Sequence, residues 1–176
     1  MSSFMTGEGI LEEGRVIVRD REYASFLKER GYGVLEGEEL ELLPEEALYL
    51  SEDKRLKIKD KDTGEEAGFQ SLAERFIRER PELWIRYLIY RDLRKKGYVV
   101  KDGYGLGLDF LVYERGSFGK EPAKFLVLGL SEGETLKLEG LLETLRMAMG
   151  SKKELILAVV ESRGDVVYYA VSYVGF

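Results

Sequence analysis

The chain has no cysteine and no histidine among its 176 residues. The missing cysteine excludes disulfides, thiolate metal sites and cysteine nucleophiles. The missing histidine removes the usual zinc ligand and the side chain best suited to proton transfer near neutral pH. We therefore expect the protein to use neither a metal nor a cofactor.

Long apolar runs are also missing from the sequence. No segment reaches the roughly 18 apolar residues that cross a bilayer, and the start, MSSFMTGEGILEEG, lacks the basic and apolar regions of a signal peptide. These features predict a cytoplasmic protein with no membrane partner. The composition is typical of a globular chain, because 44% of the residues are hydrophobic and 34% are charged. The length suits one large domain or two small ones.

The net charge of -6 is unevenly distributed along the chain. Residues 1–74 carry 10 basic and 19 acidic side chains, whereas residues 75–101 carry 9 basic and 3 acidic ones. A local positive segment attracts phosphates or an acidic protein surface whatever the net charge of the whole protein. The alternative is the solvated face of a helix, and the sequence leaves both interpretations open.

The first half of the chain alternates short strands with helical pieces. The segments GRVIV, GYGVLEGEELELL and RLKIKD are typical of strands and turns, whereas REYASFLKERG and LPEEALYL are typical of helices. A longer helix is expected over residues 81–96, where one broad apolar face would contain Trp84, Ile85, Leu88, Ile89 and Leu93. We place a domain boundary near residue 80, which gives a smaller N-terminal domain, 1–80, and a larger C-terminal domain, 81–176.

The C-terminal domain has a simple expected order of elements. Strands are predicted near residues 97–101, 106–113 and 124–130. A helix follows, because apolar residues recur at intervals of three and four, at Leu138, Leu141, Leu142, Leu145 and Met149. Two more strands complete the chain, the apolar run LILAVV at 155–160 and the segment DVVYYAVSYV.

Several segments together resemble the archaeal tRNA-splicing endonuclease family over nearly the full length. They are RGYGVLEGEELELLPEEALYL in the N-terminal half, and IYRDLRKKGYVVKDGYGLGLDFLVYERG, KFLVLGL and LLETLRMAMGSKKELILAVVESRGDVVYYAVSYV in the C-terminal half. The resemblance implies an α+β or α/β fold. A small mixed N-terminal domain would precede a nuclease-like C-terminal domain with a central mixed sheet flanked by helices.

The resemblance also implies a catalytic unit of tyrosine, histidine and lysine. The family's reaction is metal-independent and leaves a 2',3'-cyclic phosphate and a 5'-OH end. The tyrosine position matches Tyr113 and the lysine position matches Lys153, but the histidine position falls on Pro122, or on Ala123 if the loop is gapped differently. Neither residue transfers a proton, and loss of a general acid or base costs roughly 100-fold to 10,000-fold in rate. We expect no active catalytic residue in this chain.

Further residues correspond to the family's contact sites. Glu161, Ser162, Gly164 and Asp165 match an acidic loop that docks into a neighbouring subunit. The strand from Val166 to Val174 would form the subunit interface, with contacts from Val166, Val167, Tyr168, Tyr169, Val171 and Tyr173. Arg146 matches an arginine that stacks on a flipped bulge base. Possible RNA contacts in the basic segment are Arg91, Arg94, Lys95 and Lys96.

These expectations favour the structural, non-catalytic subunit of a heteromeric tRNA-splicing endonuclease. Its partner would be a catalytic subunit that contains histidine, in a heterotetramer of two plus two chains that cuts precursor tRNA at bulge-helix-bulge motifs. One alternative is a self-sufficient nuclease that uses Tyr113 and Lys153, and another is a non-enzymatic RNA-binding module. A metal-dependent nuclease using Asp109, Glu121 and Lys124 is disfavoured by the spacing of the three residues.

Overall fold

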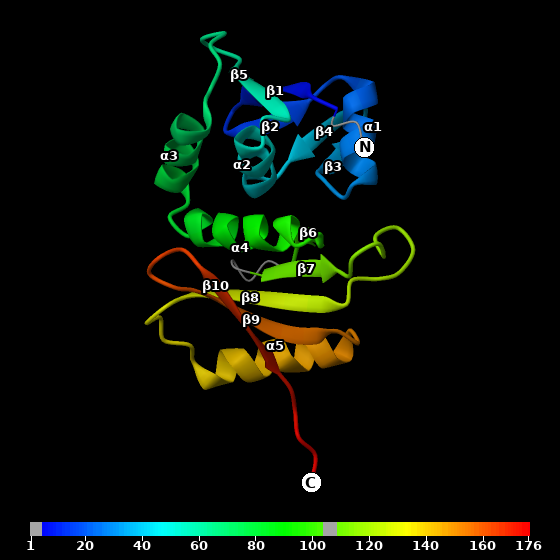
Figure 1. Cartoon of the computed structure of the whole chain (residues 1–176), viewed down its shortest axis with the longest axis vertical. Coiled ribbons are helices and arrows are strands. Elements are labelled where there is room, and N and C mark those ends of the chain that lie inside the picture. Colours follow the sequence, from blue (N-terminus) through cyan, green and yellow to red (C-terminus); the bar gives the residue numbers. More distant parts are fainter. Residues whose placement is uncertain (1–4, 104–108) are drawn as a thin grey trace. The chain divides into compact units, whose positions relative to one another are not determined.

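The computed structural model describes residues 5–103 and 109–176, which form two compact units, Met1–Tyr87 and Leu88–Phe176 (Figure 1). Each unit has its own five-stranded mixed sheet. The N-terminal unit contains β1 (Gly7–Glu12), β2 (Arg15–Val18), α1 (Arg21–Glu29), β3 (Val34–Glu36), β4 (Glu39–Leu42), α2 (Pro44–Glu52), β5 (Leu56–Asp60), α3 (Phe69–Glu79) and the start of α4 (Leu83–Lys95).

The sheet of the N-terminal unit has the order β3-β4-β2-β1-β5. Only β1 and β5 pair in parallel, with Gly9 opposite Ile58. Strand β1 was not predicted, because GEGILE lacks alternating apolar residues and its parallel partner lies far along the sequence. Its first residue must be glycine for a packing reason, since a Cβ on Gly7 would lie 2.0 Å from the Tyr23 ring.

Local hydrogen bonds fix the helix ends of this unit. The Asp20 side chain accepts from the Tyr23 backbone N–H at 2.7 Å and caps α1, an arrangement that stabilises a helix by about 1 kcal/mol. The buried Glu46 carboxylate accepts from the backbone N–H groups of Leu43, at 2.9 Å, and Gly33, at 3.0 Å. One side chain therefore ties the start of α2 to the turn before β3.

A buried ion pair joins α2 to the first part of α4. Arg86 donates to Glu45, and both side chains are almost completely inaccessible to solvent. The predicted apolar face of α4 is therefore wrong at one of its five positions, and a charged residue outside that face is buried. Arg86 lies on the buried side, whereas Trp84 is 37% exposed.

The C-terminal unit contains the rest of α4, then β6 (Val99–Asp102), β7 (Asp109–Tyr113), β8 (Phe125–Ser131), α5 (Leu138–Gly150), β9 (Glu154–Val160) and β10 (Val166–Val171). Its sheet order is β10-β9-β8-β7-β6, and only β8 and β9 pair in parallel. The predicted mixed sheet flanked by helices is confirmed. The predicted last strand is too long, because β10 ends at Val171 and Tyr173 lies beyond it.

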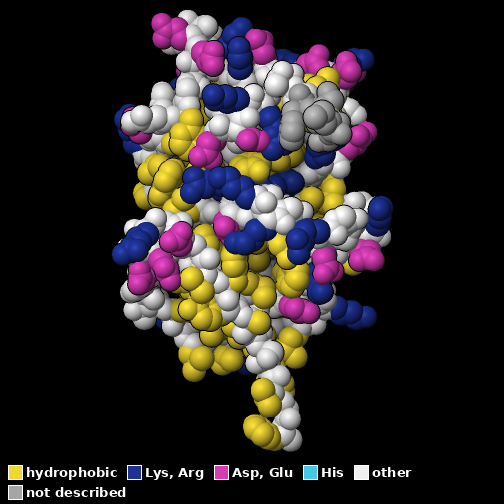
Figure 2. Space-filling model, in the orientation of Figure 1, with side chains coloured by type: hydrophobic (Ala, Val, Ile, Leu, Met, Phe, Trp, Pro, Cys, Tyr) yellow, Lys and Arg dark blue, Asp and Glu magenta, His cyan; other side chains and the backbone are white. Residues whose placement is uncertain are grey.

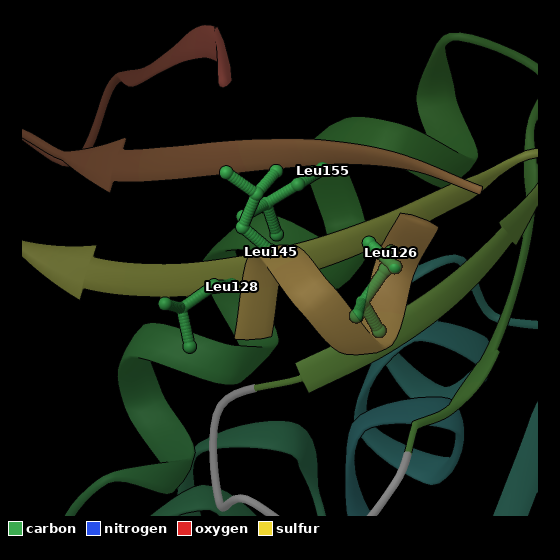
Figure 3. Packing of buried hydrophobic residues seen from close by; sticks show 5 residues of the cluster. Leu126, Leu128, Leu145 and Leu155 are labelled. Carbon is green, nitrogen blue, oxygen red and sulfur yellow. The ribbon is translucent and has the colours of Figure 1, made fainter. Parts of the chain in front are cut away.

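Helix α5 packs on this sheet through a small aliphatic core. Figure 3 shows Leu145 of α5 beside Leu155 of β9, with Leu126 and Leu128 on β8. The predicted stripe on α5 is only partly buried, however. Leu145 is 9% exposed, whereas Leu138 and Met149 are 68% and 53% exposed. The three-and-four spacing thus identified the helix correctly, and only part of its apolar stripe is buried.

Candidate functional site

Three neighbouring strand ends bring the predicted triad positions to the same end of the C-terminal sheet. Val112 of β7 lies opposite Phe125 of β8, which in turn lies opposite Glu154 of β9. One residue further toward this end, Tyr113 is the last residue of β7 and Lys153 directly precedes β9. Pro122 lies in the segment that enters β8.

The residues at this end of the sheet contact one another. The Lys153 ammonium donates to the backbone carbonyl oxygen of Ala123 at 3.0 Å. Pro122 is exposed and Ala123 is buried, and the Tyr113 ring packs edge-on against Phe118 with 5.0 Å between centroids. The structure thus brings Lys153 to the backbone of the candidate histidine position. Neither Pro122 nor Ala123, the two candidates for the histidine position, carries a side chain that transfers a proton.

The metal-dependent alternative gains no support from the described side chains. Lys124 faces Glu114 at 3.4 Å, and Glu121 is exposed. The side chain of Asp109 lies outside the described residues. Within residues 5–103 and 109–176, no three carboxylates come together in a way that could hold a metal ion.

The predicted docking loop is a tight hairpin between β9 and β10. Glu161 N–H donates to the Asp165 carbonyl, and Gly164 N–H donates to the Glu161 carbonyl, both at 2.8 Å. Gly164 has a φ of +88°, a conformation that side-chain-bearing residues rarely adopt. Ser162 N–H donates to the Glu132 carboxylate at 2.8 Å. The backbone is thereby fixed while the carboxylates of Glu161 and Asp165 remain exposed.

Strand β10 is an edge strand of the C-terminal sheet, and its residues are half-buried except for Tyr169 and Ala170, which are exposed. Tyr169 is 55% exposed, and the tail residue Tyr173 is 71% exposed. Tyr168 is turned inward instead, because its hydroxyl donates to the Asp92 carboxylate at 2.5 Å. Burial, together with that hydrogen bond, raises the pKa of Tyr168 well above its usual range. Of the six predicted interface residues, Tyr169 and Tyr173 are therefore exposed, and the other four, Tyr168 among them, are half-buried.

Further exposed apolar side chains lie on α5 and in the tail. Figure 2 shows hydrophobic side chains gathered on the viewed face of the C-terminal unit and along the tail. The exposed large apolar side chains among the described residues of this unit are Leu138, Leu142, Met149, Tyr169, Tyr173, Val174 and Phe176. For the α5 residues, the sequence pattern predicted a helix with an apolar stripe but did not indicate that part of the stripe faces solvent.

The predicted RNA-contacting side chains differ in exposure and in their contacts. Arg146 is exposed on α5, and Lys95 is exposed on the last turn of α4. Arg91 and Arg94 are half-buried, and Arg94 donates to the Tyr90 hydroxyl at 2.9 Å. Lys96 pairs with Asp92 and lies 5.1 Å from the centre of the Tyr168 ring. The basic segment is therefore partly a structural network rather than a uniform positive face.

Comparisons with known proteins agree with this architecture. The family described as tRNA intron endonuclease matches with its N-terminal domain at residues 7–73 and with its catalytic C-terminal domain at residues 83–168. A tRNA-splicing endonuclease from Methanococcus vannielii is 36% identical over 163 residues, which cover 93% of this chain and 92% of the relative. The chain belongs to the tRNA intron endonuclease family.

Other members of the family are similarly close. The tRNA-splicing endonuclease of Pyrococcus horikoshii is 34% identical over 158 residues, 90% of each chain. A protein of Methanopyrus kandleri named EndA-like protein is 33% identical and covers 96% of this chain and 98% of its own length. The match to the family's C-terminal domain begins at Leu83, the first residue of α4, and includes the 161–165 hairpin. No helix in the described part of this family member is long and apolar enough to cross a membrane.

The sequence did not predict the three buried charged side chains of the N-terminal unit. Glu45, Glu46 and Arg86 are charged residues that lie in the interior of the N-terminal unit. Charged side chains are almost never fully buried unless they are paired, so composition alone assigns them to the surface. The one available signal was the PEE sequence at the start of α2, which was interpreted only as a favourable first turn.

Proposed function

We propose that this chain is the non-catalytic subunit of a heteromeric tRNA-splicing endonuclease that removes introns from precursor tRNA. The observation that carries the proposal is the absence of histidine from the whole chain, combined with an exposed Pro122 at the candidate catalytic end. Metal-free cleavage by an RNA 2'-OH requires a group that moves a proton. A tyrosine and a lysine alone leave this step without a group suited to neutral pH.

The catalytic histidine would come from a partner subunit. Two chains of each kind would form a heterotetramer that holds two active sites at a fixed separation, as a bulge-helix-bulge substrate with two cleavage sites requires. The exposed carboxylates of Glu161 and Asp165 would dock into the partner. The open edge of β10, with Val166, Val167, Tyr169 and Val171, would pair subunits together with the tail residue Tyr173.

Cleavage assays distinguish this proposal from the two alternatives. The purified chain should not cut a bulge-helix-bulge RNA by itself, but should restore cleavage when it is added to the histidine-containing paralogue. Cleavage by the purified chain alone would establish a self-sufficient nuclease and refute the proposal. Failure to co-purify with any such paralogue would instead support a simple RNA-binding module.

A substitution at the former site gives a sharper test within the assembled enzyme. Tyr113→Phe removes the hydroxyl that a catalytic tyrosine would need, while keeping the ring that packs on Phe118. We expect an unchanged cleavage rate, whereas a catalytic Tyr113 would lower the rate by about 100-fold or more.

Charge reversal tests the docking loop. Glu161→Lys with Asp165→Lys should dissociate the assembly, measured by size-exclusion chromatography with light scattering. The matched control is Glu65→Lys with Glu66→Lys, two exposed carboxylates of the N-terminal unit that undergo the same charge change. An unchanged oligomer in the loop variant would rule out docking through this hairpin.

A further inference from the structure

A pocket of about 350 Å³ opens in the C-terminal unit beside the last turn of α4. Its floor is aliphatic and comes from α4 and three strands, through Leu93, Val112, Val127 and Ile156. Its rim consists of Lys96 and three half-buried aromatic rings, Tyr98, Phe125 and Tyr168. A pocket with an apolar floor and aromatic walls accepts a flat ring.

Each of the three rim rings has a cation beside it. Lys96 Nζ lies 5.1 Å from the centre of the Tyr168 ring. The guanidinium of Arg115 lies 5.5 Å from the centre of the Tyr98 ring, and Lys124 Nζ lies 5.4 Å from the centre of the Phe125 ring. Tyr98 and Phe125 also meet edge-on, at an interplanar angle of 83°. Each ring that lines the pocket therefore has a positive charge within 5.5 Å of its centre, and one of the three cations, Lys96, itself lines the pocket.

The backbone is shaped to let Arg115 lie along this rim. Gly97 has a φ of +91°, and a Cβ at this position would come within 3.2 Å of Arg115 Cδ. Its missing side chain leaves room for the arginine stem. Lys96 is held by Asp92, and Lys124 lies 3.4 Å from Glu114, so both lysines are partly neutralised. Arg115, which lies beside the Tyr98 ring, is therefore the cation that we expect to meet a negatively charged ligand.

We propose that this pocket binds one unpaired nucleotide of single-stranded RNA. The base would lie against Tyr98 and Phe125 over the aliphatic floor, and the adjacent phosphate would meet Arg115. Alternating aromatic and cationic side chains form the usual surface for unpaired bases, because stacking and phosphate contacts act together. An aromatic side chain of a protein partner would also fit the floor, but it would bring no negative charge to the cations. The volume lies near the lower end of the roughly 300–1,000 Å³ typical of ligand sites, which suits a single nucleotide.

This site is separate from the contacts in the proposed function. It requires neither a partner subunit nor the residues of the 161–165 hairpin, so the isolated chain should bind RNA through it. It also gives Tyr168 a role at the pocket rim instead of at the subunit interface.

The test is fluorescence anisotropy with the full chain and a labelled, unstructured single-stranded RNA of eight nucleotides. Arg115→Gln and Tyr98→Leu should each weaken binding by about 5-fold or more, since stacking and phosphate contacts are both lost in part. Lys137→Gln is the matched control, because Lys137 is exposed in the same unit, before α5, and loses the same charge. It should change the affinity by less than about 2-fold. Thermal unfolding of each variant checks that the fold is retained.

Two outcomes would overturn the inference. If Tyr98→Leu binds RNA as tightly as the wild-type chain, the pocket does not hold a base and any binding is by charge alone. If the rim variants leave RNA binding unchanged but weaken subunit assembly, the pocket holds a protein side chain instead. Photo-crosslinking with 4-thiouridine RNA adds a direct readout, with crosslinks expected at Tyr98, Phe125 or Tyr168. Variants that lose RNA binding but still assemble would support this site and would not contradict the proposed function.

Discussion

The two units differ in where their charged and apolar side chains lie. Among the described residues, the N-terminal unit buries three charged side chains, Glu45, Glu46 and Arg86, whereas the buried polar side chains of the C-terminal unit are the neutral Ser117 and Thr144. The exposed large apolar side chains show the reverse distribution. Most of them lie in the C-terminal unit, on α5, on β10 and in the tail.

This difference indicates that the two units contribute differently to stability and to assembly. A buried charge is tolerated only when its partners are fixed, so the interior of the N-terminal unit depends on specific pairs. Exposed apolar patches mark surfaces that other molecules cover. We therefore expect substitutions in the N-terminal unit to act mainly on folding, and substitutions on the open surface of the C-terminal unit to act mainly on association.

The largest effect on folding is expected at the buried ion pair. Arg86→Ala would leave the Glu45 carboxylate buried without this partner, and breaking such a pair costs about 3–5 kcal/mol. Urea unfolding of the isolated chain measures the loss. Arg80→Ala is the control, because its pair with Glu82 is exposed and such pairs contribute about 0–1 kcal/mol. Equal losses in the two variants would show that the interior position of Arg86 does not matter.

A smaller loss is expected at the carboxylate that ties α2 to the turn before β3. Glu46→Ala would leave the backbone N–H groups of Leu43 and Gly33 without this acceptor, and an unsatisfied buried donor costs about 1–3 kcal/mol. Glu46→Gln keeps one acceptor oxygen and should lose less. The same urea experiment ranks the two variants, and the opposite ranking would contradict a hydrogen-bonding role.

Much of this architecture follows from local sequence pattern. The strand β8 was predicted within one residue and the existence of the helix α5 was predicted correctly, because an apolar run and a three-and-four spacing are short-range signals. The resemblance gave the positions of Tyr113, Pro122 and Lys153, and the structure brings Lys153 to the adjacent backbone, at the Ala123 carbonyl.

Other features depend on contacts that the pattern does not encode. Strand β1 pairs with β5, some 50 residues later, so its own sequence carries little signal. The burial of Arg86 depends on Glu45 of another helix. The direction of Tyr168 depends on Asp92, which lies 76 residues away. The aromatic pocket could not be predicted either, because its rim combines separate segments.

A gain in stability is expected at the residue before Lys153. Lys152 has a φ of +57°, and the left-handed conformation costs a side-chain-bearing residue about 1–2 kcal/mol. Lys152→Gly removes that cost but adds freedom to the unfolded chain, which leaves a net gain of about 0.5–1 kcal/mol. Lys152→Ala keeps the unfavourable conformation and should show no gain. Thermal unfolding of both variants provides the comparison, and equal midpoints would contradict backbone strain at this position.

The smallest expected effect is a loss of stability at low pH, and it should be larger in the N-terminal unit than in the C-terminal unit. A hydrogen bond from Lys61 lowers the pKa of Glu12, and one from Arg75 lowers the pKa of Asp60, both in the N-terminal unit. A carboxyl group with a lowered folded pKa stabilises the fold above its unfolded pKa, near 4. That contribution is lost as the pH falls through the folded value.

Hydrogen exchange can follow this loss strand by strand. Because Glu12 and Asp60 lie on β1 and β5, amides there should lose protection before amides of β8 and β9, whose core is aliphatic. Both carboxylates are at the surface, so added salt should reduce the difference by screening the pairs. Glu12→Gln should weaken the pH dependence at β1 and leave β9 unchanged. Simultaneous loss in both sheets would mean that acid acts on the two units together, and that the pairs of Glu12 and Asp60 do not set the acid response of the N-terminal sheet.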